Sequence, residues 1–188
     1  MKNKKYVLLL ILFIVMLGAA LVEYKYLSES ISTPQFDNSG EETTDNSQQD
    51  FTVTDAQGNY IRLSDYSGKP VVINFWATWC GPCISELPSF DMLYKEYGED
   101  INFLMINMTD SNRDTFNTVG KYISENGYSF PVFYDTQASA AKAFNVYSIP
   151  HTVFIRSDGT VEKTYVGAIS EETIRTHIEK ISEYIETE

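Results

Sequence analysis

The run FWATWCGPC at residues 75–83 contains both cysteines of the chain, Cys80 and Cys83. It follows VVIN at residues 71–74, a dense series of apolar, β-forming residues typical of a strand that is buried on both faces. Beyond the run, apolar residues recur at near-helical spacing, at Leu87, Phe90, Tyr94 and Tyr97. The pattern predicts a buried strand over residues 71–77, followed by a helix whose first turn carries both thiols.

Two thiols at the start of a helix favour redox chemistry. The helix N-terminus supplies unpaired N–H groups and a partial positive charge, and both favour the thiolate over the thiol. Cys80, at the outer end, is predicted to be the exposed nucleophile, and Cys83, one turn further in, the sheltered thiol that resolves a mixed disulfide. Pro82 suits the first helical turn because it has no N–H to leave unpaired.

The alternatives for this pair are a structural disulfide and half of a zinc site. Zinc needs more ligands than two cysteines and two histidines readily provide. A purely structural bridge over so short a loop would constrain little of the unfolded chain's entropy. We therefore expect a redox-active Cys80–Cys83 disulfide, with no metal and no cofactor.

Strands and helices alternate from residue 51 onward. Strands are predicted over residues 51–54, 60–63, 71–77, 101–107, 131–134, 152–155 and 164–166. Helices are predicted after Cys83, over residues 114–126 and 138–144, and at the C-terminal end, where Ser170 is placed to cap the first turn. Parallel βαβ units followed by an antiparallel hairpin imply one mixed sheet covered by helices.

The N-terminal residues have the pattern of a membrane anchor. A basic flank at residues 1–5 precedes an apolar run at residues 6–22, which is close to the lower limit of about 17–25 residues for a membrane-spanning helix. The lysines predict that the N-terminus stays inside and the rest of the chain lies outside. We favour an uncleaved signal-anchor, with a cleaved signal peptide as the alternative. The expected location is the bacterial cell membrane, with a single span and an extracytoplasmic domain.

Composition limits the other function classes. The 188 residues suffice for one domain, and the net charge of −12 argues against binding of nucleic acid, which requires a basic face. Residues 23–50 are rich in polar and acidic residues, so they are predicted to stay solvated and extended. We interpret them as a disordered acidic tether, with a specific acidic docking site as the alternative, and expect the folded domain over residues 51–188.

The run at residues 75–83 resembles the active-site strand and helix start of the thioredoxin superfamily. SIPHT at residues 148–152 is similar to that superfamily's proline loop, and Gly167 falls where its closing hairpin carries a glycine. With the N-terminal anchor and ISELP at residues 84–88, the chain most resembles the membrane-anchored TlpA/ResA-like branch over residues 51–188. The resemblance implies an α/β thioredoxin fold, a mixed central sheet flanked by helices, with an N-terminal β-hairpin and a central helical insertion.

The resemblance also implies how the proline loop meets the substrate. It implies a cis peptide before Pro150, across from the two cysteines, which would expose the backbone of Ile149 to an extended substrate segment that pairs as an added strand. His151 is expected either to contact a mixed disulfide or to face solvent. Trp76 is expected in the core, and Trp79 is expected to present an apolar surface to protein partners.

One departure from the superfamily concerns a buried acid. Many thioredoxins carry an aspartate just before the Phe-Trp-Ala run, and here that position is Asn74, which cannot shuttle protons. Glu86 lies one helical turn after Cys83, where ResA-like proteins have an acid, so we expect Glu86 to act as an acid–base group. A carboxylate there would help to deprotonate Cys83 and would raise the pKa of both thiols by repulsion. The alternative is a solvated acid on the helix surface.

The expected function is thiol–disulfide exchange on exported proteins, such as apocytochromes before haem attachment. The Gly-Pro dipeptide between the cysteines favours the reducing direction, and a membrane electron donor is expected to regenerate the dithiol. A non-catalytic binding module is one alternative. A thiol peroxidase is another, but such peroxidases use a Pro-x-x-x-Thr-x-x-Cys arrangement that neither cysteine has.

Overall fold

The computed structural model describes residues 16–17, 50–110 and 112–183. The chain divides into two units, Met1–Thr44 and Asp45–Glu188. In the first unit only Met16 and Leu17 are described, and both are helical and exposed. The rest of the expected anchor at residues 6–22, and residues 23–49 of the expected tether, lie outside the described residues. Within the described ranges, no helix is both long enough and apolar enough to cross a membrane.

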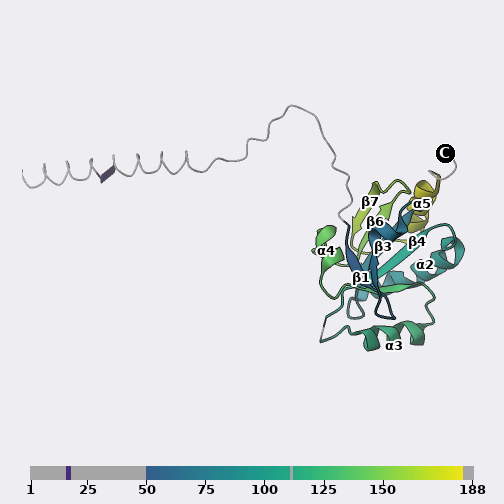
Figure 1. Ribbon diagram of the computed structural model, residues 1–188, viewed down its shortest axis with the longest axis horizontal. Coiled ribbons are helices and arrows are strands. Elements are labelled where there is room, and N and C mark those ends of the chain that lie inside the picture. The colour runs from purple at the N-terminus through teal and green to yellow at the C-terminus, as the bar shows by residue number, and fades with distance from the viewer. Residues whose placement is uncertain (1–15, 18–49, 111, 184–188) are drawn as a thin grey trace, which may run out of the picture. The chain divides into compact units, whose positions relative to one another are not determined.

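The second unit is built on one mixed sheet of seven strands in the order β2-β1-β5-β4-β3-β6-β7 (Figure 1). The strands are β1 (Thr52–Thr54), β2 (Tyr60–Arg62), β3 (Val71–Trp76), β4 (Asn102–Asn107), β5 (Val132–Tyr134), β6 (His151–Ile155) and β7 (Val161–Val166). Strands β3, β4 and β5 run parallel, whereas the hairpins β1–β2 and β6–β7 are antiparallel. The mixed sheet predicted from the sequence is confirmed, although β7 begins three residues earlier than expected.

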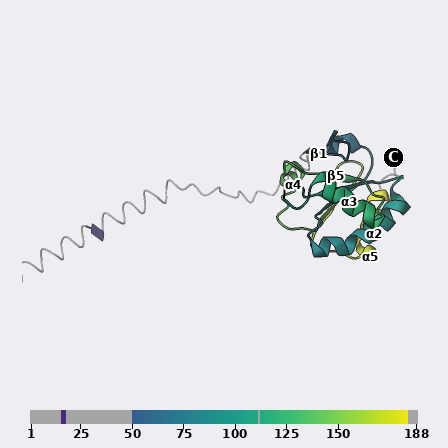
Figure 2. The ribbon, with the colours of Figure 1, turned by 90° about the horizontal axis from the view of Figure 1, so that it is seen from below.

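Helices cover both faces of the sheet. The helices are η1 (Leu63–Tyr66), α2 (Gly81–Tyr97), α3 (Phe116–Asn126), α4 (Ser139–Ala143) and α5 (Glu171–Ser182). Helices α2 and α5 lie together on one face, and α4 lies on the other (Figures 1 and 2). Helix α3, with strand β5 after it, forms the central insertion between β4 and α4. The thioredoxin fold expected from the sequence is thus confirmed, with its N-terminal hairpin.

The central strand β3 is buried along its whole length because both layers cover it. Its alternate side chains enter two separate cores: Val72 and Trp76 pack with α2 and α5, whereas Ile73 and Phe75 pack on the side of α4. This burial on both faces explains the dense apolar sequence of the strand. Strand β3 ends at Trp76, and a short loop then leads directly into α2.

Candidate active site

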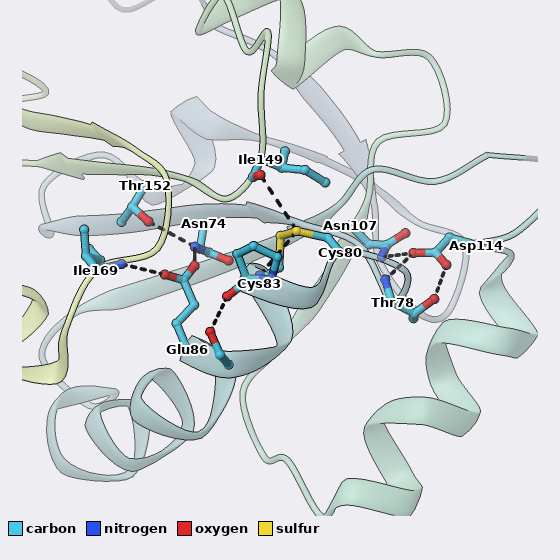
Figure 3. Close-up of a disulfide and its surroundings, with 12 residues drawn as sticks. Asn74, Thr78, Cys80, Cys83, Glu86, Asn107, Asp114, Ile149, Thr152 and Ile169 are labelled. Carbon is cyan, nitrogen blue, oxygen red and sulfur yellow. Dashed lines mark hydrogen bonds between the residues drawn. A yellow bond between two sulfur atoms is a disulfide. The ribbon is translucent and has the colours of Figure 1, made fainter.

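The two cysteines form a disulfide at the N-terminus of α2 (Figure 3). Cys80 has an extended backbone and is the N-cap residue, and its Sγ atom accepts a hydrogen bond of 3.3 Å from the N–H of Cys83. Pro82 lies in the first turn, where its missing N–H leaves no donor unpaired. The strand, the loop and the helix start therefore place both sulfur atoms where the helix N-terminus favours negative charge.

The two sulfur-bearing side chains differ in exposure. Cys80 is 6% exposed and Cys83 is fully buried, so attack from outside can reach only Cys80. The sequence predicts an exposed Cys80, but in this oxidised structure Cys80 is almost covered. The reason is that the proline loop lies against it. In the described part of the chain, no three His, Cys, Asp or Glu side chains gather to hold a metal ion.

The proline loop faces the disulfide. The Ile149–Pro150 peptide bond is cis, as the resemblance implies, and the Ile149 carbonyl oxygen lies 3.8 Å from Cys80 Sγ. The Pro150 carbonyl accepts a hydrogen bond of 2.8 Å from the N–H of Gly167, whose φ of 96° is one that glycine tolerates readily. In the disulfide Sγ has no proton to donate, but after reduction the Cys80 thiol can donate to the Ile149 carbonyl.

A groove of about 500 Å³ adjoins this contact. Trp79 and Ile149 line it beside the disulfide, and Tyr147 lines it further along the proline loop. Trp79 is 45% exposed, as expected for a partner-facing residue, whereas Trp76 is fully buried in the core. Tyr147, 82% exposed, is missing from the sequence-based prediction, and the only signal for it is an aromatic residue just before the Ser-Ile-Pro run.

The expectation that His151 faces solvent is wrong, whereas its contact with a mixed disulfide stays a prediction. Its side chain is buried, and its ring meets the Phe75 ring edge-on at 5.7 Å between centroids. It therefore contacts the core on the side of α4 and does not face solvent. Neither ring nitrogen has a hydrogen-bond partner among the described residues, and burial lowers the pKa of His151.

Glu86 is buried, so it is not a solvated acid on the helix surface. One carboxyl oxygen accepts a hydrogen bond of 2.7 Å from Asn74 Nδ2, and the other accepts one of 3.1 Å from the backbone N–H of Ile169. Burial raises the pKa of Glu86 to about 7, and the two hydrogen bonds oppose that rise only in part. Near neutral pH this carboxyl can therefore both accept and release a proton.

Asn74 connects Glu86 to the strand next to it. Its Nδ2 group also donates to Thr152 Oγ1 at 3.0 Å, and its Oδ1 atom is buried without a hydrogen-bond partner in the described structure. The amide at the position of the superfamily's aspartate thus holds Glu86 in place from β3. Figure 3 shows this group on one side of the disulfide, with Asp114 on the other.

Comparisons with known proteins agree with this geometry. Residues 45–164 match the AhpC/TSA family. The "Thiol-disulfide oxidoreductase ResA" of Geobacillus kaustophilus is 37% identical over 133 residues, which cover 70% of this chain and 74% of the relative. The Bacillus subtilis protein of the same name is 33% identical over 132 residues, covering 70% and 72%.

A solved structure is similar over nearly its whole length. The crystal structure of the pneumococcal exposed lipoprotein thioredoxin Etrx1 from Streptococcus pneumoniae is 30% identical, with a TM-score of 0.60. The match covers 69% of this chain and 98% of that one. The fold and the cysteine pair therefore agree with the thiol-disulfide oxidoreductases and the thioredoxin to which the chain is similar.

The buried acid leads to a prediction about stability. Replacement of Glu86 by Gln should raise the free energy of unfolding at pH 8 by up to about 3 kcal/mol relative to wild type, and much less at pH 4.5. Between about pH 4.5 and 7, Glu86 is ionised in the unfolded chain but still protonated in the folded chain. The free energy of unfolding of the wild type therefore falls as the pH rises through this range. Urea unfolding at a series of pH values measures this difference.

The matched control is Glu99→Gln, at an exposed carboxyl. Its effect on the unfolding free energy should be small and nearly independent of pH. A Glu86→Gln effect that stays constant between pH 4.5 and 8 would show that folding does not raise the pKa of Glu86, because the folded and unfolded chains would then take up protons alike.

Proposed function

The chain belongs to the AhpC/TSA family and is a ResA-like thiol-disulfide oxidoreductase of the thioredoxin superfamily, and we propose that it reduces disulfides of exported proteins. The observation that carries the proposal is the Cys80–Cys83 pair at the start of α2, with Cys80 against the Ile149 carbonyl. This arrangement offers one sulfur at the helix cap beside the proline loop, one fully buried sulfur and a backbone acceptor for a substrate segment.

The reaction starts from the dithiol. The Cys80 thiolate attacks one sulfur of the substrate disulfide, a mixed disulfide forms, and the other substrate sulfur leaves as a thiolate. The Cys83 thiolate then attacks Cys80 Sγ, which releases the second substrate sulfur and forms the Cys80–Cys83 disulfide. Two electrons have passed to the substrate, and a membrane electron donor returns the pair to the dithiol.

Glu86 serves the second step in this proposal. The Cys83 thiol is fully buried and must lose its proton before it attacks. Glu86 lies one helical turn further along α2, and its raised pKa of about 7 suits a group that takes up and releases a proton near neutral pH. Asn74 and the Ile169 N–H orient the Glu86 carboxyl, but neither amide can itself take up or release a proton near neutral pH.

The substrate contacts come from Trp79 and the proline loop. An extended segment around the substrate cysteine pairs with the backbone of Ile149, next to Pro150, and its side chains enter the groove beside Trp79. His151, one residue further, supports the loop from the core.

We also place the reaction outside the cytoplasm. The apolar residues 6–22 after the basic residues 1–5 support a single signal-anchor, residues 23–50 an acidic tether, and residues 51–188 the catalytic domain. The pneumococcal relative, described as an exposed lipoprotein, supports the same side of the membrane. Apocytochromes before haem attachment are the proposed substrates, because they must hold two reduced thiols.

The division of labour between the thiols gives the direct test. Cys80→Ser should abolish reduction of insulin, whereas Cys83→Ser should attack disulfides without resolving them and should accumulate covalent mixed disulfides through Cys80. Mass spectrometry of the trapped adducts identifies the sulfur involved. Adducts on Cys83 in the Cys80→Ser variant would overturn the assignment.

Parallel assays on the wild type separate this function from its two alternatives. A binding module would reduce neither insulin nor hydroperoxide, and a thiol peroxidase would consume hydroperoxide in preference to insulin. In the peroxidase arrangement a threonine stands three residues before the cysteine, and here Ala77 occupies that position relative to Cys80. We therefore expect insulin reduction with little peroxide consumption.

The role of Glu86 predicts two opposite changes in the Glu86→Gln variant. Removal of the charge should lower the pKa of the thiols, while loss of the proton acceptor should slow release of the mixed disulfide at pH 7, by about a hundredfold. The measurements are a pH titration of thiol alkylation and single-turnover reduction of insulin. If both curves superimpose on those of the wild type, Glu86 has no part in the chemistry.

A further inference from the structure

A second buried carboxyl lies beside the disulfide, and the mechanism above does not use it. Asp114, just before α3, is fully buried. One of its oxygens accepts hydrogen bonds of 2.8 Å from the backbone N–H of Thr78 and from Asn107 Nδ2. The other accepts a short hydrogen bond from the Thr78 hydroxyl. We call these three residues the Asp114 clamp (Figure 3).

The clamp joins three segments of the chain, and its contacts between Thr78 and Asp114 span 36 residues. Thr78 lies in the loop between β3 and α2, Asn107 ends β4, and Asp114 belongs to the insertion. Removal of the carboxyl would leave buried donors without partners, which is costly inside a protein. The contact therefore fixes the loop after β3 to a part of the structure outside the redox motif.

That loop carries the nucleophile. Cys80 follows Thr78 by two residues, and its N–H donates to the Ala77 carbonyl at 3.2 Å, which closes the turn. The same turn sets the extended backbone that lets Cys80 Sγ face the N–H of Cys83 at the helix start. A shift of Thr78 would thus move Cys80 relative to the donor that favours its thiolate.

The insertion contacts this loop at a second place. The Arg113 guanidinium lies 3.9 Å from the centre of the Trp79 ring, within the range of a cation–π interaction. Two neighbouring residues of the insertion, Arg113 and Asp114, therefore hold the two residues that immediately precede Cys80. These contacts are independent of the hydrogen bonds that surround Glu86.

We propose that the Asp114 clamp positions Cys80 for thiol–disulfide exchange, with Asp114 and Thr78 as positioning residues. By holding Thr78, the clamp keeps Cys80 Sγ aligned with the N–H of Cys83, so that the thiolate gains this hydrogen bond. The inference rests on the proposed role of Cys80 as the nucleophile. It assigns to the insertion a part in the chemistry, in addition to its part in the fold.

The test uses the full chain in a Cys83→Ser background, in which Cys80 is the only thiol. Thr78→Val removes the hydroxyl and keeps the size, Thr78→Ser restores the hydroxyl, and Asp114→Asn changes the acceptor. The control is Thr118→Val, the same chemical change in the first turn of α3, at a hydroxyl that donates to the backbone carbonyls of Arg113 and Thr115 and not to the Asp114 carboxyl. The rate of Cys80 alkylation is measured against pH, and thermal unfolding is followed in parallel.

The clamp predicts that Thr78→Val raises the pKa of Cys80, with about three- to tenfold less thiolate at neutral pH, as loss of one hydrogen bond implies. Asp114→Asn removes an acid as well as the acceptor, and loss of a negative charge would act in the opposite direction, so the decision rests on Thr78→Val. Thr78→Ser and Thr118→Val should match the parent. If removal of the Asp114 carboxyl prevents folding, Thr78→Val still decides the question, because Thr78 is only half-buried.

Two results would overturn the proposal. One is a Thr78→Val protein whose alkylation profile equals that of the parent, which would make the clamp purely structural. The other is an equal shift in Thr118→Val, which would trace the effect to general loosening of α3. Failure of the proposed function is visible separately, because the Cys83→Ser parent would then form no mixed disulfide with insulin.

Discussion

The redox centre depends on one contact across the first turn of α2, from the N–H of Cys83 to Sγ of Cys80. It exists because β3 is buried on both faces, ends at Trp76 and passes through a short turn into the helix. The two cysteines occupy the turn in which a helix has free N–H groups, so the same backbone that starts the helix stabilises a thiolate. The roles of the two sulfurs follow from their positions: Cys80 is the N-cap residue of α2 and attacks first, and Cys83 is fully buried in the first turn and resolves the mixed disulfide.

Two buried carboxyls, Glu86 and Asp114, flank this contact, and they differ in the number of hydrogen-bond donors that they meet. Glu86 meets an amide and one backbone N–H, and burial raises its pKa to about 7. Asp114 meets three donors and fixes the loop that leads to Cys80. The first is suited to move a proton and the second to hold a position. The disulfide lies between them in Figure 3.

The fold and the cysteine pair were predictable because their signals are local: apolar periodicity marks the strands and helices, and the resemblance at residues 75–83 and 148–152 marks the thiols and the cis Pro150. The environment of single side chains was not predictable in the same way. Glu86 is held by Ile169, 83 residues away, and Thr78 by Asp114, 36 residues away. His151 was not expected to be buried, but in the antiparallel pairing of β3 and β6 it lies opposite Phe75 and therefore on the core face on the side of α4. The contacts of Glu86 and Thr78 join residues of helices and loops that only the tertiary fold brings together, which local periodicity does not specify.

The direction of electron flow is the central claim, and the reduction potential of the Cys80–Cys83 couple tests it most directly. Equilibration of the wild type with dithiol redox buffers at pH 7, followed by alkylation of free thiols, measures this potential. Thiol–disulfide proteins of this fold span from about −270 to about −120 mV. The account predicts a value near the reducing end of that range. A value near the oxidising end would contradict it, because the dithiol would then be too stable to reduce the disulfides of exported proteins.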